Sequence, residues 1–137
     1  MLGEELVDSY LQDQLNKKII SGYEWSSIKN AVEAFDFVIG EKEFLDVKST
    51  SGGFSQKIHV SINELLHMRD LPSYKIYRVY SIDKQRAKLR ISANMQQFAV
   101  SVLQKIDPLI SGVRVDTVSI SPDILIFGQE IEIEIFA

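Results

Sequence analysis

The chain contains no cysteine and only two histidines, His59 and His67. The absence of thiols excludes disulfides, thiolate zinc sites and thiol catalysis, and it fits a reducing compartment. Neither histidine has a partner at metal-ligand spacing, so we interpret both as structural residues. The sequence begins Met-Leu-Gly-Glu-Glu, without the basic and apolar segments of a secretory signal, and no apolar run is long enough to span a membrane. We therefore expect a cytoplasmic protein without a membrane partner.

The composition is typical of one globular domain. The chain has 137 residues, of which 45% are hydrophobic and 25% are charged. A chain of this length can bury roughly two-thirds of the surface that it exposes when unfolded. It has no internal repeat, low-complexity tract or linker. We expect a single domain over residues 1–137, and its abrupt start inside a helix signal is consistent with a piece of a longer protein.

The net charge is small, but charges of the two signs are segregated along the chain. The formal net charge of -4 argues against simple electrostatic adhesion to nucleic acid. The segment 74–90 is nevertheless strongly basic, and every charged residue after Arg114 is acidic: Asp116, Asp123, Glu130, Glu132 and Glu134. We expect the basic residues Lys84, Arg86, Lys88 and Arg90 to contact nucleic acid, the alternative being that they keep a sheet edge soluble. The three glutamates indicate a solvated strand face.

Alternating and helical patterns predict a mixture of helices and strands. Helical periodicity covers residues 3–18, and a capping-box pattern, Ser61-Ile-Asn-Glu64, begins a helix that reaches about residue 69. Ser92 is expected to cap a further helix that Asp107-Pro108 ends or shortly follows. Strands are predicted over 23–28, 35–39, 43–48, 57–61, 74–82, 87–91, 113–120 and 131–135.

Two acidic residues interrupt neighbouring apolar strands. Asp36 lies in Phe35-Asp-Phe-Val-Ile39, and Asp46 lies in Glu43-Phe-Leu-Asp-Val-Lys48. If Gly40-Glu41-Lys42 is the turn of a hairpin and Ile39 is opposite Glu43, Asp36 faces Asp46, and Lys48 lies on the same face. Like charges at this position repel each other unless a cation lies between them. The pattern therefore predicts a bound cation.

Carboxylates beside a lysine suit phosphodiester hydrolysis. Magnesium prefers oxygen ligands and is commonly held by one or two carboxylates together with substrate phosphate. The metal lowers the pKa of water, and Lys48 can orient the attacking hydroxide or stabilise the phosphorane oxygens. The alternative for an isolated Asp-x-Lys triplet is a solvated cross-strand ion pair worth about 0.2–1 kcal/mol.

The order of these segments resembles the PD-(D/E)XK nuclease superfamily, whose core is helix, three strands, helix and strand. Within it, the runs Leu45-Asp-Val-Lys-Ser-Thr-Ser-Gly52, Val60-Ser-Ile-Asn-Glu-Leu65 and Tyr74-Lys-Ile-Tyr-Arg-Val-Tyr80 are similar to the domain named after the carboxy-terminal part of the plant protein NO VEIN. The resemblance covers residues 3–82. Such domains often occur in bacterial restriction and phage-defence proteins.

The resemblance implies a set of site residues. Asp36 and Asp46 ligate magnesium, the Val47 carbonyl adds a ligand, and Lys48 is the catalytic lysine. Glu4 matches a helix acid that many relatives direct toward the metal, although the helix dipole alone also favours an acid in a first turn. Phe35 stands where the family often has proline. Glu64 matches a recurrent acid, but its capping box alone explains it.

We therefore expect an α/β domain of restriction-endonuclease-like fold, with a central mixed sheet, an α-β-β-β-α-β core and an additional C-terminal helix and strands. The expected function is a magnesium-dependent endonuclease, with manganese as a substitute, that cuts DNA rather than RNA in a defence system. Two alternatives stay open: a non-catalytic nucleic-acid-binding or assembly module of a larger protein, and a plain protein-interaction domain. The sequence also leaves open pairing into a homodimer or with other subunits.

Overall fold

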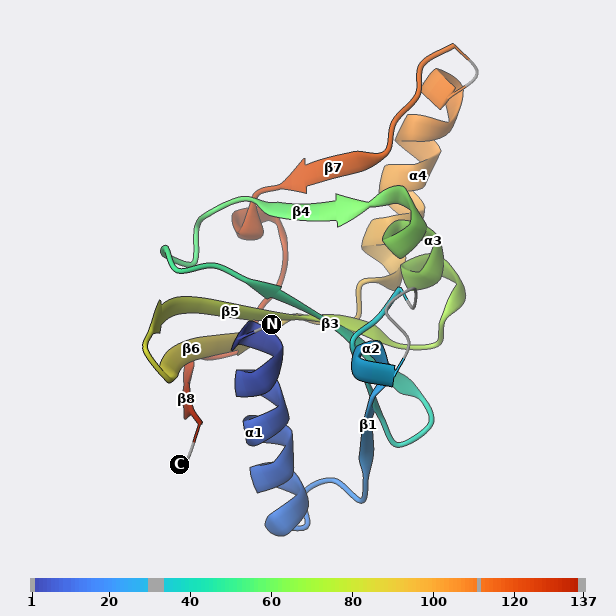
Figure 1. Ribbon diagram of the computed structural model, residues 1–137. Coiled ribbons are helices and arrows are strands. Elements are labelled where there is room, and N and C mark those ends of the chain that lie inside the picture. Colours follow the sequence, from blue (N-terminus) through green and yellow to red (C-terminus); the bar gives the residue numbers. More distant parts are fainter. Residues whose placement is uncertain (1, 30–33, 111, 136–137) are drawn as a thin grey trace.

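The computed structural model describes residues 2–29, 34–110 and 112–135 (Figure 1). The helices in this part of the chain are α1 (Leu2–Asn16), α2 (Ser26–Lys29), α3 (Ile62–Asp70) and α4 (Gln96–Ile110), with a 3-10 turn η1 (Pro122–Ile124). The strands are β1 (Tyr23–Trp25), β2 (Phe37–Ile39), β3 (Glu43–Ser49), β4 (Ile58–Ser61), β5 (Tyr74–Asp83), β6 (Arg86–Ile91), β7 (Thr117–Ile120) and β8 (Ile131–Glu134). None of the described helices combines the length and apolar character that a membrane span requires.

The central sheet is mixed and has six strands in the order β1-β2-β3-β5-β6-β8. The first three strands are antiparallel neighbours, whereas β3 and β5 are parallel and are connected through α3. The strands β6 and β8 continue the sheet in antiparallel pairing. The predicted α/β class with a central mixed sheet is confirmed.

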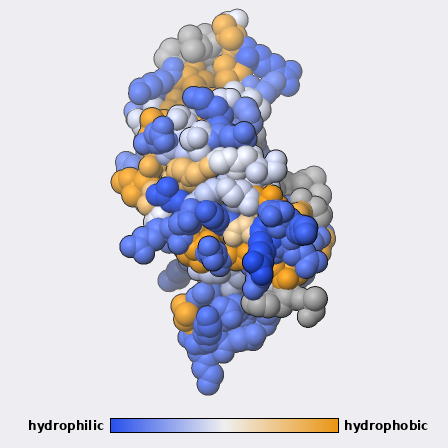
Figure 2. Space-filling view, turned by 90° about the vertical axis from the view of Figure 1, so that its left-hand side faces the viewer, coloured by the Kyte–Doolittle hydropathy of each residue, from blue (hydrophilic) through white to orange (hydrophobic). Residues whose placement is uncertain are grey.

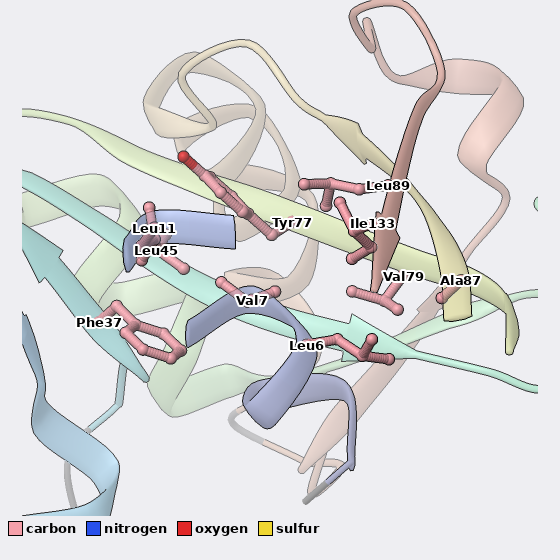
Figure 3. Packing of buried hydrophobic residues seen from close by; sticks show 10 residues of the cluster. All are labelled: Leu6, Val7, Leu11, Phe37, Leu45, Tyr77, Val79, Ala87, Leu89 and Ile133. Carbon is pink, nitrogen blue, oxygen red and sulfur yellow. The ribbon is translucent and has the colours of Figure 1, made fainter. Parts of the chain in front are cut away.

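The two faces of this sheet carry different elements. The helix α1 covers one face, where Leu6, Val7 and Leu11 pack against Phe37 and Leu45 (Figure 3). The other face is covered by α3 and α4 together with a separate two-stranded sheet of β4 and β7 (Figure 1). Since side chains alternate along a strand, Leu45 and Val47 of β3 face α1 while Asp46 and Lys48 face α3. This alternation assigns the candidate site to the α3 face.

Two predicted helix boundaries and two predicted strands differ from the structure, since the strand predicted over 113–120 forms only as β7 (Thr117–Ile120). The predicted strand over 23–28 ends at Trp25, and Ser26 begins α2. Ser92 does not cap α4, because its hydroxyl accepts a hydrogen bond from Ile76 N at 2.8 Å; the helix begins at Gln96, whose N–H bonds to the Asn94 side chain at 3.2 Å. The helix then continues past residues 107–108 to Ile110, two residues beyond the predicted end.

The strand predicted over 57–61 forms as β4 but does not join the central sheet. Its partner is β7, with Ile58 opposite Ile120 and Ser61 opposite Thr117. When β4 and the short α2 are set aside, the chain order from α1 through β1, β2, β3 and α3 to β5 is helix, three strands, helix and strand. The chain therefore leaves the central sheet after Ser49 and returns to it at Tyr74, after α3.

Candidate active site

The hairpin of β2 and β3 has the predicted register, with Ile39 opposite Glu43. Asp36 lies just before β2, where its N–H bonds to Leu45 O at 2.9 Å. Its carboxylate Oδ2 accepts a hydrogen bond from Val47 N at 2.8 Å. These two contacts fix Asp36 beside the residue that follows Leu45, which is Asp46.

Asp46 is buried in the middle of β3, opposite Ile76 of the parallel strand β5. Its Oδ2 lies 2.9 Å from Lys48 Nζ. This contact is an ion pair without hydrogen-bond geometry, and Oδ2 itself has no hydrogen-bond partner. Burial raises the pKa of the Asp46 carboxyl well above its usual range, and hydrogen bonding to Glu64 and Asp36 raises it further. The carboxyl is therefore poised between the neutral acid and a form that needs a cation.

Lys48 lies among these acids as an ammonium. Its Nζ is 2.9 Å from Asp46 Oδ2 and 2.9 Å from Glu64 Oε2. Burial favours the neutral amine, but the charges of Asp46 and Glu64 outweigh burial and raise the pKa of Lys48 above its ordinary value. Lys48 is consequently protonated at neutral pH and is unsuited to act as a general base.

Glu64 completes the cluster, in addition to forming the helix cap that its sequence position predicts. The capping box is present, with Glu64 N donating to Ser61 Oγ at 3.0 Å and Ser61 N donating to Glu64 Oε1 at 2.8 Å. The same carboxylate also accepts from Lys48. Burial opposes its ionisation, but hydrogen bonding with Asp46 and the charge of Lys48 lower the pKa of Glu64. A signal for this role was available, because a helix that crosses between parallel strands starts near the carboxyl end of the first one, where Lys48 lies.

Glu4 lies elsewhere. Its Oε1 accepts hydrogen bonds from Trp25 Nε1 at 3.0 Å and from Ser27 Oγ at 2.5 Å. It belongs to α1, the helix on the opposite face of the sheet, and it has no contact with the acids around Lys48. Its assignment as a metal ligand stays a prediction, as does that of the Val47 carbonyl.

Arg78 is a buried cation that sequence reasoning counted only as part of the basic segment. It pairs with Lys48 in the β3–β5 register and is 2% exposed. It donates to Lys48 O at 3.3 Å and to Gln56 O at 2.7 Å, whereas its Nε has no partner. Desolvation lowers the pKa of this guanidinium. Arg78 thus holds together the two ends of the segment that connects β3 to β4, which we call the 49–56 loop.

The loop is fixed on its other side by aromatic contacts. The Phe54 ring lies 5.3 Å from the Tyr80 ring and 5.0 Å from the Phe127 ring. The Arg90 guanidinium lies 4.2 Å from the centre of the Phe54 ring and also donates to Gly128 O at 2.8 Å. Arg90, a predicted nucleic-acid contact, therefore has an internal structural role.

The other basic residues of the predicted nucleic-acid surface lie beside the acidic strand. Arg86 is 3.3 Å from Glu134 and Lys88 is 3.6 Å from Glu130, because β6 and β8 are neighbours. The charge segregation seen along the sequence is thus not maintained in space. Lys84 is exposed at the β5–β6 turn with a φ of 59°.

One surface hollow lies away from the acids. A hollow of about 400 Å³ is lined by residues of β5, β6 and β8, including Arg86, Lys88 and Glu134, and by none of the cluster around Lys48. Figure 2 looks onto the end of the molecule that carries the β5–β6 turn, where hydrophilic residues cover most of the surface between apolar patches. The chemistry of the buried cluster, not the size of a hollow, identifies the candidate site.

The fold and site define a mixed α/β domain in which a parallel strand pair and its connecting helix bring acids and a lysine together. Residues 3–92 match the family described as Protein NO VEIN, C-terminal, and the chain belongs to this family. The matched segment runs from α1 through β6 and includes Asp36, Asp46, Lys48 and Glu64. No curated protein and no solved structure matches the chain.

Proposed function

We propose that this protein is a magnesium-dependent nuclease of the PD-(D/E)XK superfamily, with a restriction-endonuclease-like fold, that cleaves phosphodiester bonds in DNA within a restriction or phage-defence system. The observation that carries the proposal is the convergence of Asp36, Asp46 and Lys48 on one face of the sheet, where the ammonium already serves as the counter-ion of a buried carboxyl. Strongly perturbed ionisable groups gathered in this way are typical of catalytic sites.

The topology supports the assignment to the superfamily. An antiparallel meander of three strands is followed by a helix and a strand parallel to the third one. This is the helix, three strands, helix and strand order that the resemblance implies. The strand β4 is then an addition, paired with β7 outside the central sheet.

The residues present fit a magnesium ion. Asp46 Oδ2 is a buried carboxylate oxygen without a hydrogen bond, and Asp36 uses one oxygen on Val47 N and leaves the other for a ligand. In the described part of the chain no three acidic or histidine side chains form a complete metal cage. Magnesium commonly needs none, since it keeps waters and binds one or two carboxylates with substrate phosphate. Asp36, Asp46 and the Val47 carbonyl would hold the ion, and manganese would substitute for it.

Each group then has a separate task. The metal, when bound, supplies charge neutralisation and a more acidic water. Asp36 and Asp46 hold it at the sheet surface. Lys48, protonated throughout, stabilises negative charge on the oxygens of the phosphoryl group rather than removing a proton.

A non-catalytic nucleic-acid-binding or assembly module is the second candidate. The observation that favours the assembly role is the pairing of Arg86 and Lys88 with Glu134 and Glu130, because these two cations then offer little free charge to DNA. In this case the carboxylates would retain only a structural role.

The deciding experiment is incubation of supercoiled DNA, and of RNA in parallel, with wild type, Lys48→Ala and Lys105→Ala in magnesium and then manganese. Lys105 is an exposed lysine of α4 and serves as the matched control. We expect Lys48→Ala to lose cleavage by about 10²–10³-fold or more, as when a charge-stabilising donor is removed. Equal cleavage by all three proteins would refute the assignment. A protein that binds DNA but neither cuts it nor shows a metal-dependent rise in melting temperature would be the second candidate.

A further inference from the structure

Glu64 has two sets of contacts at once. On one side, its Oε1 accepts a hydrogen bond from Ser61 N at 2.8 Å, which anchors the carboxylate to the first turn of α3. On the other side, Oε1 and Oε2 accept from Lys48 Nζ at 3.1 and 2.9 Å. The carboxylate therefore connects the start of the helix to the lysine of β3.

Helix capping does not account for this arrangement. In a capping box the glutamate needs only one oxygen, which accepts from the N–H of the N-cap residue. At a solvated helix end its other oxygen faces water. Here the Glu64 side chain is 15% exposed and that of Lys48 is 19% exposed. An ion pair shielded to this degree is held more firmly than a surface pair, and each partner would lose a necessary counter-charge if the other were removed.

We propose that Glu64 is a positioning residue that holds the Lys48 ammonium at the site when a divalent cation occupies Asp36 and Asp46. This inference rests on the proposed function and deepens it. In the structure, Lys48 contacts both Asp46 and Glu64. A divalent ion on Asp46 would compete for that carboxylate and repel the ammonium, whose four-carbon stem could then turn away. Glu64 provides the second anchor that keeps the ammonium in reach of the phosphoryl oxygens.

Two substitutions separate positioning from capping. Glu64→Gln removes the negative charge but keeps the length and a carbonyl oxygen for Ser61 N, so the cap is retained. Ser61→Ala removes the acceptor of Glu64 N but leaves the backbone N–H of residue 61 bonded to the Glu64 carboxylate. The first variant loses the negative charge and one of the two oxygens that accept from Lys48, and the second loses part of the cap.

The first measurement compares single-turnover cleavage, DNA affinity and melting temperature. We expect Glu64→Gln to slow cleavage about 10–100-fold, the usual effect of removing a group that orients a site residue, with DNA affinity unchanged. Ser61→Ala should lower the melting temperature and leave the cleavage rate at 25 °C unchanged. Wild-type cleavage by Glu64→Gln, or an equal loss in both variants, would overturn the inference.

The second measurement follows Lys48 itself and does not depend on cleavage. The side-chain Cε and Nζ resonances of Lys48, identified by their loss in Lys48→Met, report whether the ammonium is fixed. We expect a rigid side chain in wild type and Ser61→Ala with and without magnesium, and a mobile one in Glu64→Gln. If Lys48 becomes mobile in wild type when magnesium is added, the Glu64 carboxylate has left Lys48 for the metal. If Lys48 stays rigid in Glu64→Gln, a group other than the Glu64 carboxylate holds it. Either result would overturn the inference, whereas failure of wild type to cut any nucleic acid would overturn the nuclease proposal alone.

Discussion

Acidic and basic side chains meet across neighbouring elements in two regions of this protein, with opposite consequences. In the cluster around Lys48, the side chains of Lys48 and Asp46 are 19% and 8% exposed. In the pairs between β6 and β8, those of Arg86 and Glu134 are 81% and 41% exposed. Both regions look alike in the sequence, as charged residues alternating with apolar ones in strands.

Burial is what distinguishes the two regions. Exposed pairs are screened by water and salt, and each contributes roughly 0–1 kcal/mol to stability. Among buried groups the cost of desolvation competes with pairing, so the acids and the lysine have shifted pKa values and one carboxylate oxygen lacks a hydrogen bond. The exposed pairs cost the fold little, whereas the buried cluster keeps ionisable groups where desolvation disfavours their charge.

Asp46→Asn should have the largest effect. An amide has two N–H donors, which can serve Glu64 and Asp36, whereas the protonated acid has a single O–H; the amide carries no charge for a cation. We expect cleavage to fall by about 10³-fold or more and the metal-free protein to be stabilised by on the order of 1–3 kcal/mol, the cost of an uncompensated buried polar group. Urea unfolding and cleavage assays check both, with the exposed Asp116→Asn as control. A less stable Asp46→Asn protein would show that the ionised carboxylate supports the fold.

The pH dependence of stability should separate the two acids of the cluster. The folded pKa of Asp46 lies above the ordinary 3.8, so its contribution to stability is complete below pH 3.8 and is lost as pH rises through the folded value. The folded pKa of Glu64 lies below the ordinary 4.5, so its contribution is complete above pH 4.5 and is lost as pH falls through the folded value.

Between pH 4.5 and the folded pKa of Asp46, only Asp46 of these two acids titrates. Wild type should therefore become less stable as pH rises through this window, by up to about 1.4 kcal/mol per pH unit. Urea unfolding in chelator at a series of pH values should show wild type losing stability relative to Asp46→Asn above pH 4.5. Parallel curves for the two proteins would mean that the Asp46 carboxyl titrates normally.

Arg78→Met should loosen the 49–56 loop. The variant loses the hydrogen bonds to Lys48 O and Gln56 O but fills a similar volume. We expect a loss of about 1–3 kcal/mol of stability, because two part-buried carbonyls lose a charged donor, and faster proteolysis within the loop. Arg114→Met, at an arginine 87% exposed, is the matched control. If the loop in Arg78→Met is cut no faster than in wild type, Phe54 and not Arg78 anchors it.

Substitutions in the exposed region should have the smallest effect. Lys84→Ala and Lys88→Ala should each change the free energy of unfolding by less than about 0.5 kcal/mol. If this surface contacts phosphate, Lys84→Ala should reduce the slope of the logarithm of DNA affinity against the logarithm of salt concentration by about one. Lys88→Ala should reduce it by less, because Glu130 already pairs with Lys88. Fluorescence titrations of labelled DNA at several salt concentrations test this; equal slopes in all proteins would remove both lysines from the interface.

Local signals in the sequence predicted the parts of the fold that depend on neighbouring residues. The length of the turn after Ile39 set the register that brings Asp36 beside Asp46, and Ser61 with Glu64 marked the start of α3. These features follow from contacts a few residues apart, which the sequence pattern contains directly.

Features that depend on distant partners were missed. Ser92 resembled a helix cap, but Ile76 N, on the neighbouring strand, uses its hydroxyl. The second role of Glu64 needs Lys48, and the burial of Arg78 needs the loop that folds over it. Residues with an adequate local explanation are therefore the ones whose distant role is most easily overlooked.

The separate sheet of β4 and β7 shows why the family boundary is not a folding boundary. The match ends at residue 92, yet three elements inside it depend on later ones. Strand β4 pairs with β7, and β6 pairs with β8. Leu65 and Met68 of α3 lie in one hydrophobic cluster with Ala99 and Leu103 of α4. A fragment trimmed to the matched segment would leave the helix that carries Glu64 without its support. The last third of the chain is thus the scaffold on which the cluster around Lys48 depends, and expression trials should retain it.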